Sequence, residues 1–130
     1  MRWDGSQWQS LGDGMDASVR ALTIFANDLY AGGAFSTAGA ISASFVAHWD
    51  GSAWSALSSG TDDEVRALTV SDSELIVGGD FSNAGGSPAN RIAAWDGFSW
   101  APLGMGLNAS VQTLQDFQGS LVAGGIFTQA

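Results

Sequence analysis

The sequence contains no cysteine and no lysine, and each absence excludes a kind of chemistry. Without cysteine the chain forms no disulfide, offers no thiolate to a metal and has no thiol nucleophile. Four arginines face thirteen Asp and Glu, which gives a formal net charge of −9 at pH 7. Nucleic acids and anionic membrane surfaces both attract clustered cations, so we expect neither as a partner.

Long hydrophobic runs are also missing, so no segment has the length and composition of a membrane-spanning helix. The first residues, MRWDGSQW, have neither the basic start nor the apolar stretch of a signal peptide. Proline occurs only twice, whereas glycine occurs eighteen times and apolar residues make up 45% of the chain. This composition favours a β-rich domain with a substantial core. It leaves the cellular compartment open.

The most informative pattern is one unit repeated every 46 residues. Trp3, Trp49 and Trp95 open its three copies, and no gap is needed to keep the copies in phase. Such a fixed interval is typical of a repeat architecture, so residues 1–130 form a single domain of three units. The same interval relates Trp8, Trp54 and Trp100, the glycine doublets Gly32-Gly33, Gly78-Gly79 and Gly124-Gly125, and the apolar sets Val19, Val65 and Val111, and Leu22, Leu68 and Leu114.

Each unit carries the pattern of four short strands in a meander. WDGSAW places a Trp on either side of a turn whose Gly accepts a positive φ, so two strands can reverse tightly. The segments VRALT, LIVGG, RIAAW and WSAL are the first to fourth strands, counted from the inside of the sheet outwards. Pro102 fits a fourth strand at an edge, where its missing N–H faces solvent. The third copy stops after its second strand.

The repeated tryptophans, glycines and arginines are predicted to be structural. Each Trp pair belongs to the two outer strands, where wedge-shaped sheets leave the widest gap, while a glycine doublet suits a close backbone approach. Arg20 and Arg66 share a repeat position that is Gln112 in the third copy. We expect these arginines to bond loop carboxylates or carbonyls between neighbouring units.

The spacing of LIVGG, RIAAWDG, W-x-x-L and VRALTV resembles kelch-like and galactose-oxidase-like β-propeller blades. More narrowly, GGDFSNAGG followed by NRIAAWDGFSW is similar to a repeat of large exported proteins from planctomycetes and related bacteria. The resemblance covers essentially the whole chain and implies an all-β fold of three propeller blades and an extracellular location. The copper ligands of galactose oxidase have no counterpart, so its chemistry is not implied.

Three blades do not close a ring, because propellers typically have four to eight. The third copy offers first and second strands, whereas the start of the chain offers third and fourth strands. We therefore expect the ring to be closed by oligomerisation, with these half-blades pairing between copies. A dimer with six blades is favoured, and a trimer with nine is the alternative. The remaining interpretation is a fragment of a longer propeller.

Candidate binding residues lie in the polar loops. The adjacent carboxylates of Asp62, Asp63 and Glu64 are of the type that ligates a hard cation such as Ca²⁺. Their spacing is not that of a known calcium loop, so we predict no metal site and no cofactor. His48 is the only histidine and is Ala94 in the next unit, which favours a structural role. The candidates are Asp13, Asp16, Asp62, Asp63, Glu64 and Asn108 before the first strands, and Asn83 and Asn90 after a second strand.

No catalytic constellation occurs, and no G-x-S-x-G nucleophile turn is present. The sequence therefore favours a non-enzymatic scaffold or binding module. Repeated shallow loops suit repeated ligands, so carbohydrate or another extracellular polymer is the expected ligand class. The first alternative is a hydrolase or lyase with a site on the central axis. The second is a propeller fragment without a ligand, whose only property is assembly.

Overall fold

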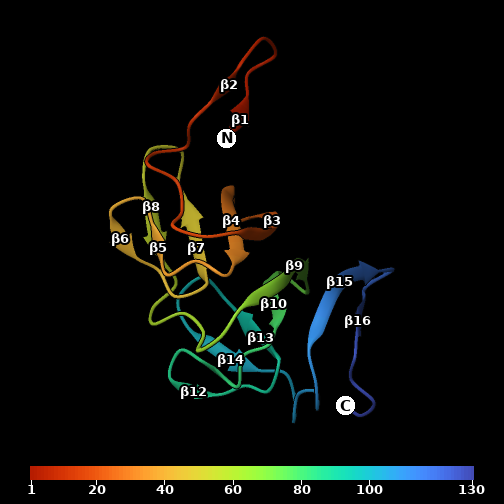
Figure 1. The fold of residues 1–130 in the computed structure, drawn as a ribbon. Helices are drawn as coiled ribbons and strands as arrows, with labels where there is room; N and C mark the ends of the chain where they lie inside the picture. The colour runs from red at the N-terminus through yellow and green to blue at the C-terminus, as the bar shows by residue number, and fades with distance from the viewer.

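The computed structural model describes all residues 1–130 and contains strands but no helix. Sixteen strands form two four-stranded sheets and four two-stranded hairpins, all of them antiparallel (Figure 1). The predicted all-β fold class is therefore confirmed. No helix of the kind that crosses a membrane is found.

The two four-stranded sheets are meanders, because strands adjacent in the sheet follow one another along the chain. The first sheet consists of β3 (Val19–Phe25), β4 (Asp28–Gly33), β7 (Val46–Trp49) and β8 (Trp54–Ala56). The second sheet consists of β9 (Val65–Ser71), β10 (Glu74–Gly79), β13 (Ile92–Trp95) and β14 (Trp100–Pro102). Pro102 thus lies on an edge strand.

Short hairpins occupy the loops between the second and third strands of these sheets. They are formed by β5 (Thr37–Ala38) with β6 (Ile41–Ser42), and by β11 (Asn83–Ala84) with β12 (Ser87–Pro88). Isolated bridges join Met15 to Ala38 and Thr61 to Ala84, so each loop hairpin is attached to the loop that precedes the same sheet. The sequence pattern predicted these segments only as polar loops.

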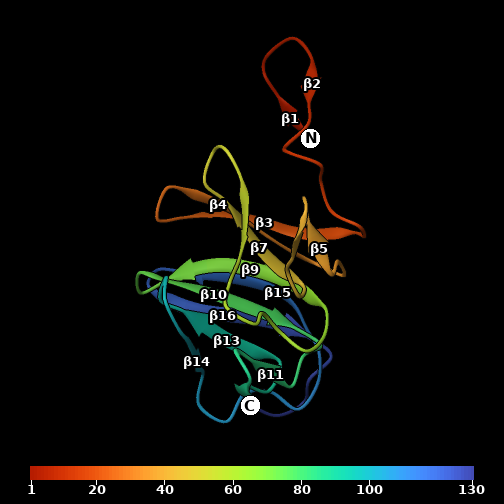
Figure 2. The same cartoon turned by 90° about the vertical axis from the view of Figure 1, so that its left-hand side faces the viewer.

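Two further hairpins correspond to halves of a sheet. The hairpin of β1 (Arg2–Trp3) and β2 (Trp8–Gln9) is equivalent to the third and fourth strands, and it projects away from the rest of the chain (Figures 1 and 2). The hairpin of β15 (Val111–Phe117) and β16 (Ser120–Gly125) is equivalent to the first and second strands. It contacts the second sheet, so that β9 lies between β3 and β15.

The Trp-Asp-Gly motif builds the turn between the third and fourth strands. In the first sheet Trp49 lies opposite Trp54, with ring centroids 5.4 Å apart. The Asp50 carboxylate accepts hydrogen bonds from the amides of Ser52 and Ala53 at 2.7 and 2.9 Å, and these bonds lower the pKa of Asp50 to about 2. The same turn recurs at Asp4 and Asp96.

Neighbouring units pack through the first glycine of each doublet. A Cβ atom at Gly78 would lie 2.6 Å from Val111 Cγ1 on β15, and a Cβ at Gly32 would meet Val65 on β9. Because a methyl group does not fit in this space, glycine allows the next unit's first strand to lie directly on the sheet. Buried residues of the first sheet, such as Tyr30, therefore share one core cluster with Val65 and Leu75 of the second.

Candidate functional site

A cleft of about 660 Å³ opens on the face of the first sheet that points away from the second sheet. Its walls include residues of the β1–β2 hairpin and of the loop that follows, among them Asp13. Its floor is apolar, since Val19, Leu22 and Ile24 of β3 line it and remain exposed. Leu22 and Ile24 are each 61% exposed, which is unusual for aliphatic side chains in the middle of a strand.

The equivalent face of the second sheet is covered. There Val65 is completely buried, and Leu68 and Val70 are partly buried against the core that includes Tyr30 of the first sheet. The residue types at these positions are nearly the same as in β3. Exposure of the cleft floor therefore reflects a missing neighbour and not a different amino-acid pattern.

A second apolar face is open on the β15–β16 hairpin. Val122 is 50% exposed, whereas its equivalents in the complete sheets, Tyr30 and Ile76, are 4% and 3% exposed. Phe117 is likewise exposed, although its equivalent Phe25 is buried. The chain thus has one open apolar face on its first repeat and another on its third.

The β1–β2 hairpin carries an exposed Trp pair. Trp8 is 63% exposed, while the equivalent Trp54 is 8% exposed. The Trp54 indole N–H donates to the Leu11 carbonyl at 2.9 Å, and the Trp100 indole donates to the Leu57 carbonyl at 3.0 Å. Both acceptors lie 43 residues earlier in the chain, in the preceding unit. No such acceptor is within reach of Trp8 in its own chain.

Three of the predicted loop residues cap the loops of their own sheets. Asp16, Asp62 and Asn108 are equivalent, and each accepts two backbone hydrogen bonds at 2.8–3.1 Å from the loop after the second strand. A bond from the Ser36 hydroxyl, together with the Thr37 amide, lowers the pKa of Asp16 to about 2. The donor amides are those of Ser36, Thr37, Ser82, Asn83, Thr128 and Gln129.

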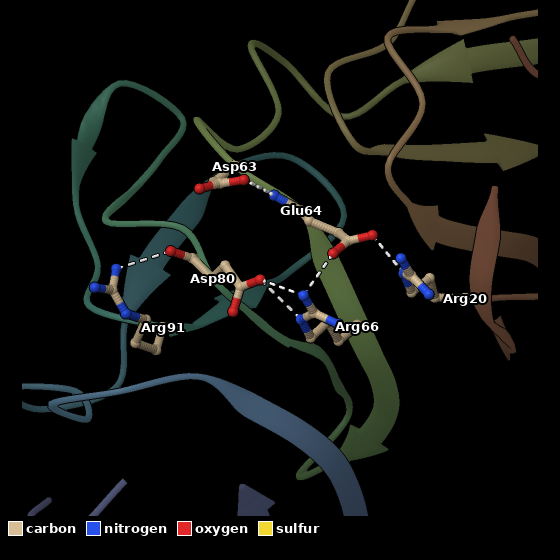
Figure 3. Close-up of polar contacts among 6 residues, drawn as sticks. All are labelled: Arg20, Asp63, Glu64, Arg66, Asp80 and Arg91. Carbon is tan, nitrogen blue, oxygen red and sulfur yellow. Dashed lines mark hydrogen bonds and ion pairs between the residues drawn. The ribbon is translucent and has the colours of Figure 1, made fainter. Parts of the chain in front are cut away.

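Glu64 and the two equivalent arginines form an ion-pair network between the sheets (Figure 3). Arg20 of β3 pairs with Glu64, which also contacts Arg66 of β9 at 2.8 Å. Arg66 in turn lies 2.7 Å from Asp80. Its hydrogen bond lowers the pKa of Asp80, and the same bond raises the pKa of Arg66. Glu64 thereby connects the first strand of one sheet to that of the next.

The rest of this charged region is also internally bonded. The Arg91 guanidinium donates to the carbonyl oxygens of Asp80 and Phe81 at 2.8 and 2.9 Å. The Asp63 carboxylate accepts the Glu64 amide at 2.7 Å. These bonds direct the charged groups toward the chain itself. The structure contains no group of three or more His, Cys, Asp or Glu side chains arranged to hold a metal ion.

His48 lies apart from this network, on β7. Its Nδ1 is 3.1 Å from a carboxylate oxygen of Asp28, and its ring stacks on Tyr30 with centroids 5.3 Å apart. Burial raises the pKa of the Tyr30 hydroxyl. No partner of His48 was predicted, because the residues at positions 28, 30 and 48 differ between the units.

Two of the predicted loop residues, Asn90 and Asn108, line a second cavity of about 340 Å³, and the other predicted loop residues do not line it. Asp13 lines the cleft, Asp62 and Asn83 bond each other, and the Asn90 side chain donates to the Met105 carbonyl at 2.9 Å. Two open apolar faces agree with the expectation that three units alone do not close a ring, but the cleft and the residues that line it were not predicted. Comparison with known proteins finds no matching family model, no matching curated protein and no matching solved structure.

Proposed function

We propose that the chain is a non-enzymatic scaffold whose units are kelch-like propeller blades and whose ring is closed by other copies of itself. One observation carries this proposal: the same repeat positions are buried between neighbouring units and exposed on the two open faces. Val122 is 50% exposed where Ile76 is 3% exposed, and Leu22 is exposed where Leu68 is partly covered.

A second copy is the partner whose shape these faces already fit. Within the chain, the face of the second sheet that is equivalent to the cleft floor is covered by Tyr30 and its neighbours on the first sheet. The β15–β16 hairpin carries Val122 at the same repeat position as Tyr30. The β15–β16 hairpin of one copy can therefore fill the cleft on the first sheet of another. Burying an exposed Leu or Ile contributes about 1.5–3 kcal/mol, so covering several such residues on both faces supports a stable complex.

Head-to-tail joints between copies form a ring where their rotation closes, and we propose that they do so here. Two copies give six blades, which we favour, and three copies give nine. Such a ring presents the loops capped by Asp16, Asp62 and Asn108 on one face at regular intervals. We propose carbohydrate or another extracellular polymer as the ligand class of that face, because repeated loops bind repeated ligands with avidity.

Native mass spectrometry at micromolar concentration tests the assembly. Two or three chains per particle support the proposal, whereas a folded monomer overturns it. Leu22→Asp places a charge on the cleft floor and should produce monomers. Phe98→Asp is the matched control, because Phe98 is 91% exposed in a turn outside both open faces, and this variant should assemble like the unchanged chain.

Glycan-array binding tests the ligand class separately. Binding to a polymeric glycan by the assembled protein, weakened in the Leu22→Asp monomer, supports a repeated loop site. Absence of binding together with turnover of a glycan substrate would instead favour an enzyme.

A further inference from the structure

We infer the register of the joint between copies: β1 of one copy pairs with β16 of a second copy, and Arg2 lies opposite Val122 of that copy. This inference rests on the proposed assembly and adds to it which strands meet and which residues face each other. Three sets of contacts inside the chain lead independently to the same arrangement.

The first set is strand pairing. In the first sheet Leu29 lies opposite Trp49 and Tyr30 opposite His48. In the second sheet the residues 46 positions later keep this register, as Leu75 lies opposite Trp95 and Ile76 opposite Ala94. The residues a further 46 positions along the chain are Leu121 and Val122 on β16.

The partners that this register requires are the residues of β1. Trp3 and Arg2 are equivalent to Trp95 and Ala94, so Trp3 takes the place opposite Leu121 and Arg2 the place opposite Val122. Within the chain β16 pairs only with β15, and β1 only with β2. Both strands therefore have a free edge that can accept a further strand.

The second set is the indole hydrogen bond. Trp54 donates to the Leu11 carbonyl and Trp100 to the Leu57 carbonyl. The equivalent acceptor for Trp8 is the Leu103 carbonyl of the second copy. Leu57 and Leu103 each accept a backbone bond from a glycine three residues later, at 3.0 and 3.1 Å. A carbonyl oxygen has two lone pairs, so Leu103 keeps the capacity that Leu57 uses for Trp100.

The third set is the contact at the glycine of the second strand. Val65 and Leu68 lie over Gly32, and Val111 and Leu114 lie over Gly78. At the joint the same positions are Val19 and Leu22 of one copy and Gly124 of the other. Val19 and Leu22 are exposed residues of the cleft floor. Gly124 lies on β16, on the open face that also carries Val122. Strand pairing, indole bond and apolar contact thus require one common placement.

Disulfide trapping tests the register, because the chain has no cysteine of its own. Opposite residues of antiparallel strands have Cα atoms about 4.5–5.5 Å apart, within the roughly 4.4–6.8 Å that a disulfide spans. The variant Arg2→Cys/Val122→Cys, oxidised at micromolar concentration, should yield a covalent oligomer on non-reducing gels. Arg2→Cys/Leu121→Cys is the matched control, since a shift of one residue points the two side chains to opposite faces.

The outcomes separate the register from the assembly. Cross-linking of the Arg2/Val122 variant without cross-linking of the control supports the inference. The second outcome assumes that native mass spectrometry shows oligomers for the unchanged protein and for both reduced variants. The register is then wrong if the control cross-links as well as the test variant, or if neither variant cross-links. A monomeric unchanged protein overturns the proposed assembly itself, and the register with it.

Discussion

The second sheet and the β15–β16 hairpin share apolar residues and glycines at several repeat positions but differ in what covers them. Ile76 and Val122 occupy the same repeat position and are both β-branched aliphatic residues, yet only Ile76 is buried. Ile76 shares a core cluster with Val111 and Leu114 of the following unit, whereas no unit in the structure covers Val122. In this repeat protein, burial is a property of the contact between units more than of a unit by itself.

The largest difference should come from placing a charge at this shared position. Ile76→Asp buries a carboxylate without a partner and should destabilise the chain by more than about 4 kcal/mol. Val122→Asp leaves the charge in water and should abolish assembly while the chain stays folded. Circular dichroism and native mass spectrometry measure the two effects. Equal loss of folding in both variants would contradict the comparison.

A smaller effect is expected from removing a tryptophan of a complete sheet. Trp54→Ala removes a buried ring and the bond to the Leu11 carbonyl, and should cost on the order of 3–5 kcal/mol in urea unfolding. Trp8→Ala should cost far less in a monomeric background such as Leu22→Asp, because Trp8 is exposed there. If Trp8→Ala is as costly as Trp54→Ala in that background, the β1–β2 hairpin is packed within its own chain.

The glycine contact between units should give a moderate effect. In Gly78→Ala the new methyl group meets Val111 Cγ1 at 2.6 Å, and such overpacking typically costs about 1–3 kcal/mol. Val111→Ala removes the obstructing methyl groups, so the double variant should be more stable than the sum of the two single changes implies. A double-mutant cycle by urea unfolding measures this coupling. Additive effects would show that the two units are not in contact there.

The smallest effect concerns acid stability and distinguishes the first loop from the third. The hydrogen bonds from Ser36 and Thr37 lower the pKa of Asp16 from 3.8, the ordinary value of an aspartate, to about 2. Asp16 therefore contributes stability at pH values above 3.8, and this contribution is lost as the pH falls from about 4 toward 2. Between about pH 4 and pH 2 the urea midpoint of Asp16→Asn should therefore fall less than that of the unchanged chain. The variant should still fold, because Asn108 forms the same cap in the third repeat.

A control for this titration is Asp50→Asn, which removes a different low-pKa carboxylate in a turn outside the loop face. It should flatten the pH dependence without changing the contacts of Ser36 and Thr37. An unchanged slope for Asp16→Asn would mean that the carboxylate is not bonded as the structure shows.

The repeat predicted the parts of the fold that recur, and it missed those that do not. The Trp pairs, the Asp-Gly turns and the four-strand meander were visible because each residue has an equivalent 46 positions away. The loop hairpins β5–β6 and β11–β12 were not predicted, since strands of two residues are too short to show an alternating pattern. Their attachment depends on bridges to distant loops.

The charged contacts show a similar limit. A polar partner for Arg20 and Arg66 was expected, but Glu64 was predicted only as a candidate binding residue. Its equivalents in the other units are both serine, so the repeat did not indicate that it pairs with these arginines. The capping role of Asp16 was indistinguishable from ordinary solvated charge. The replacement of Asp16 and Asp62 by the uncharged Asn108 was the available clue, because an amide oxygen can accept the same backbone hydrogen bonds as a carboxylate.

The meander order also bears on how the protein is made. In each four-stranded sheet the strands pair in chain order, with only a short loop hairpin between the second and third strands, so all pairing partners of the first sheet lie within residues 19–56. Short sequence separation between contacts favours rapid folding, and the sheets can form one after another during translation. The proposed pairing of β1 with β16 of another copy requires two finished chains to meet. Its rate should therefore rise with the concentration of the protein, whereas the folding of each sheet should not.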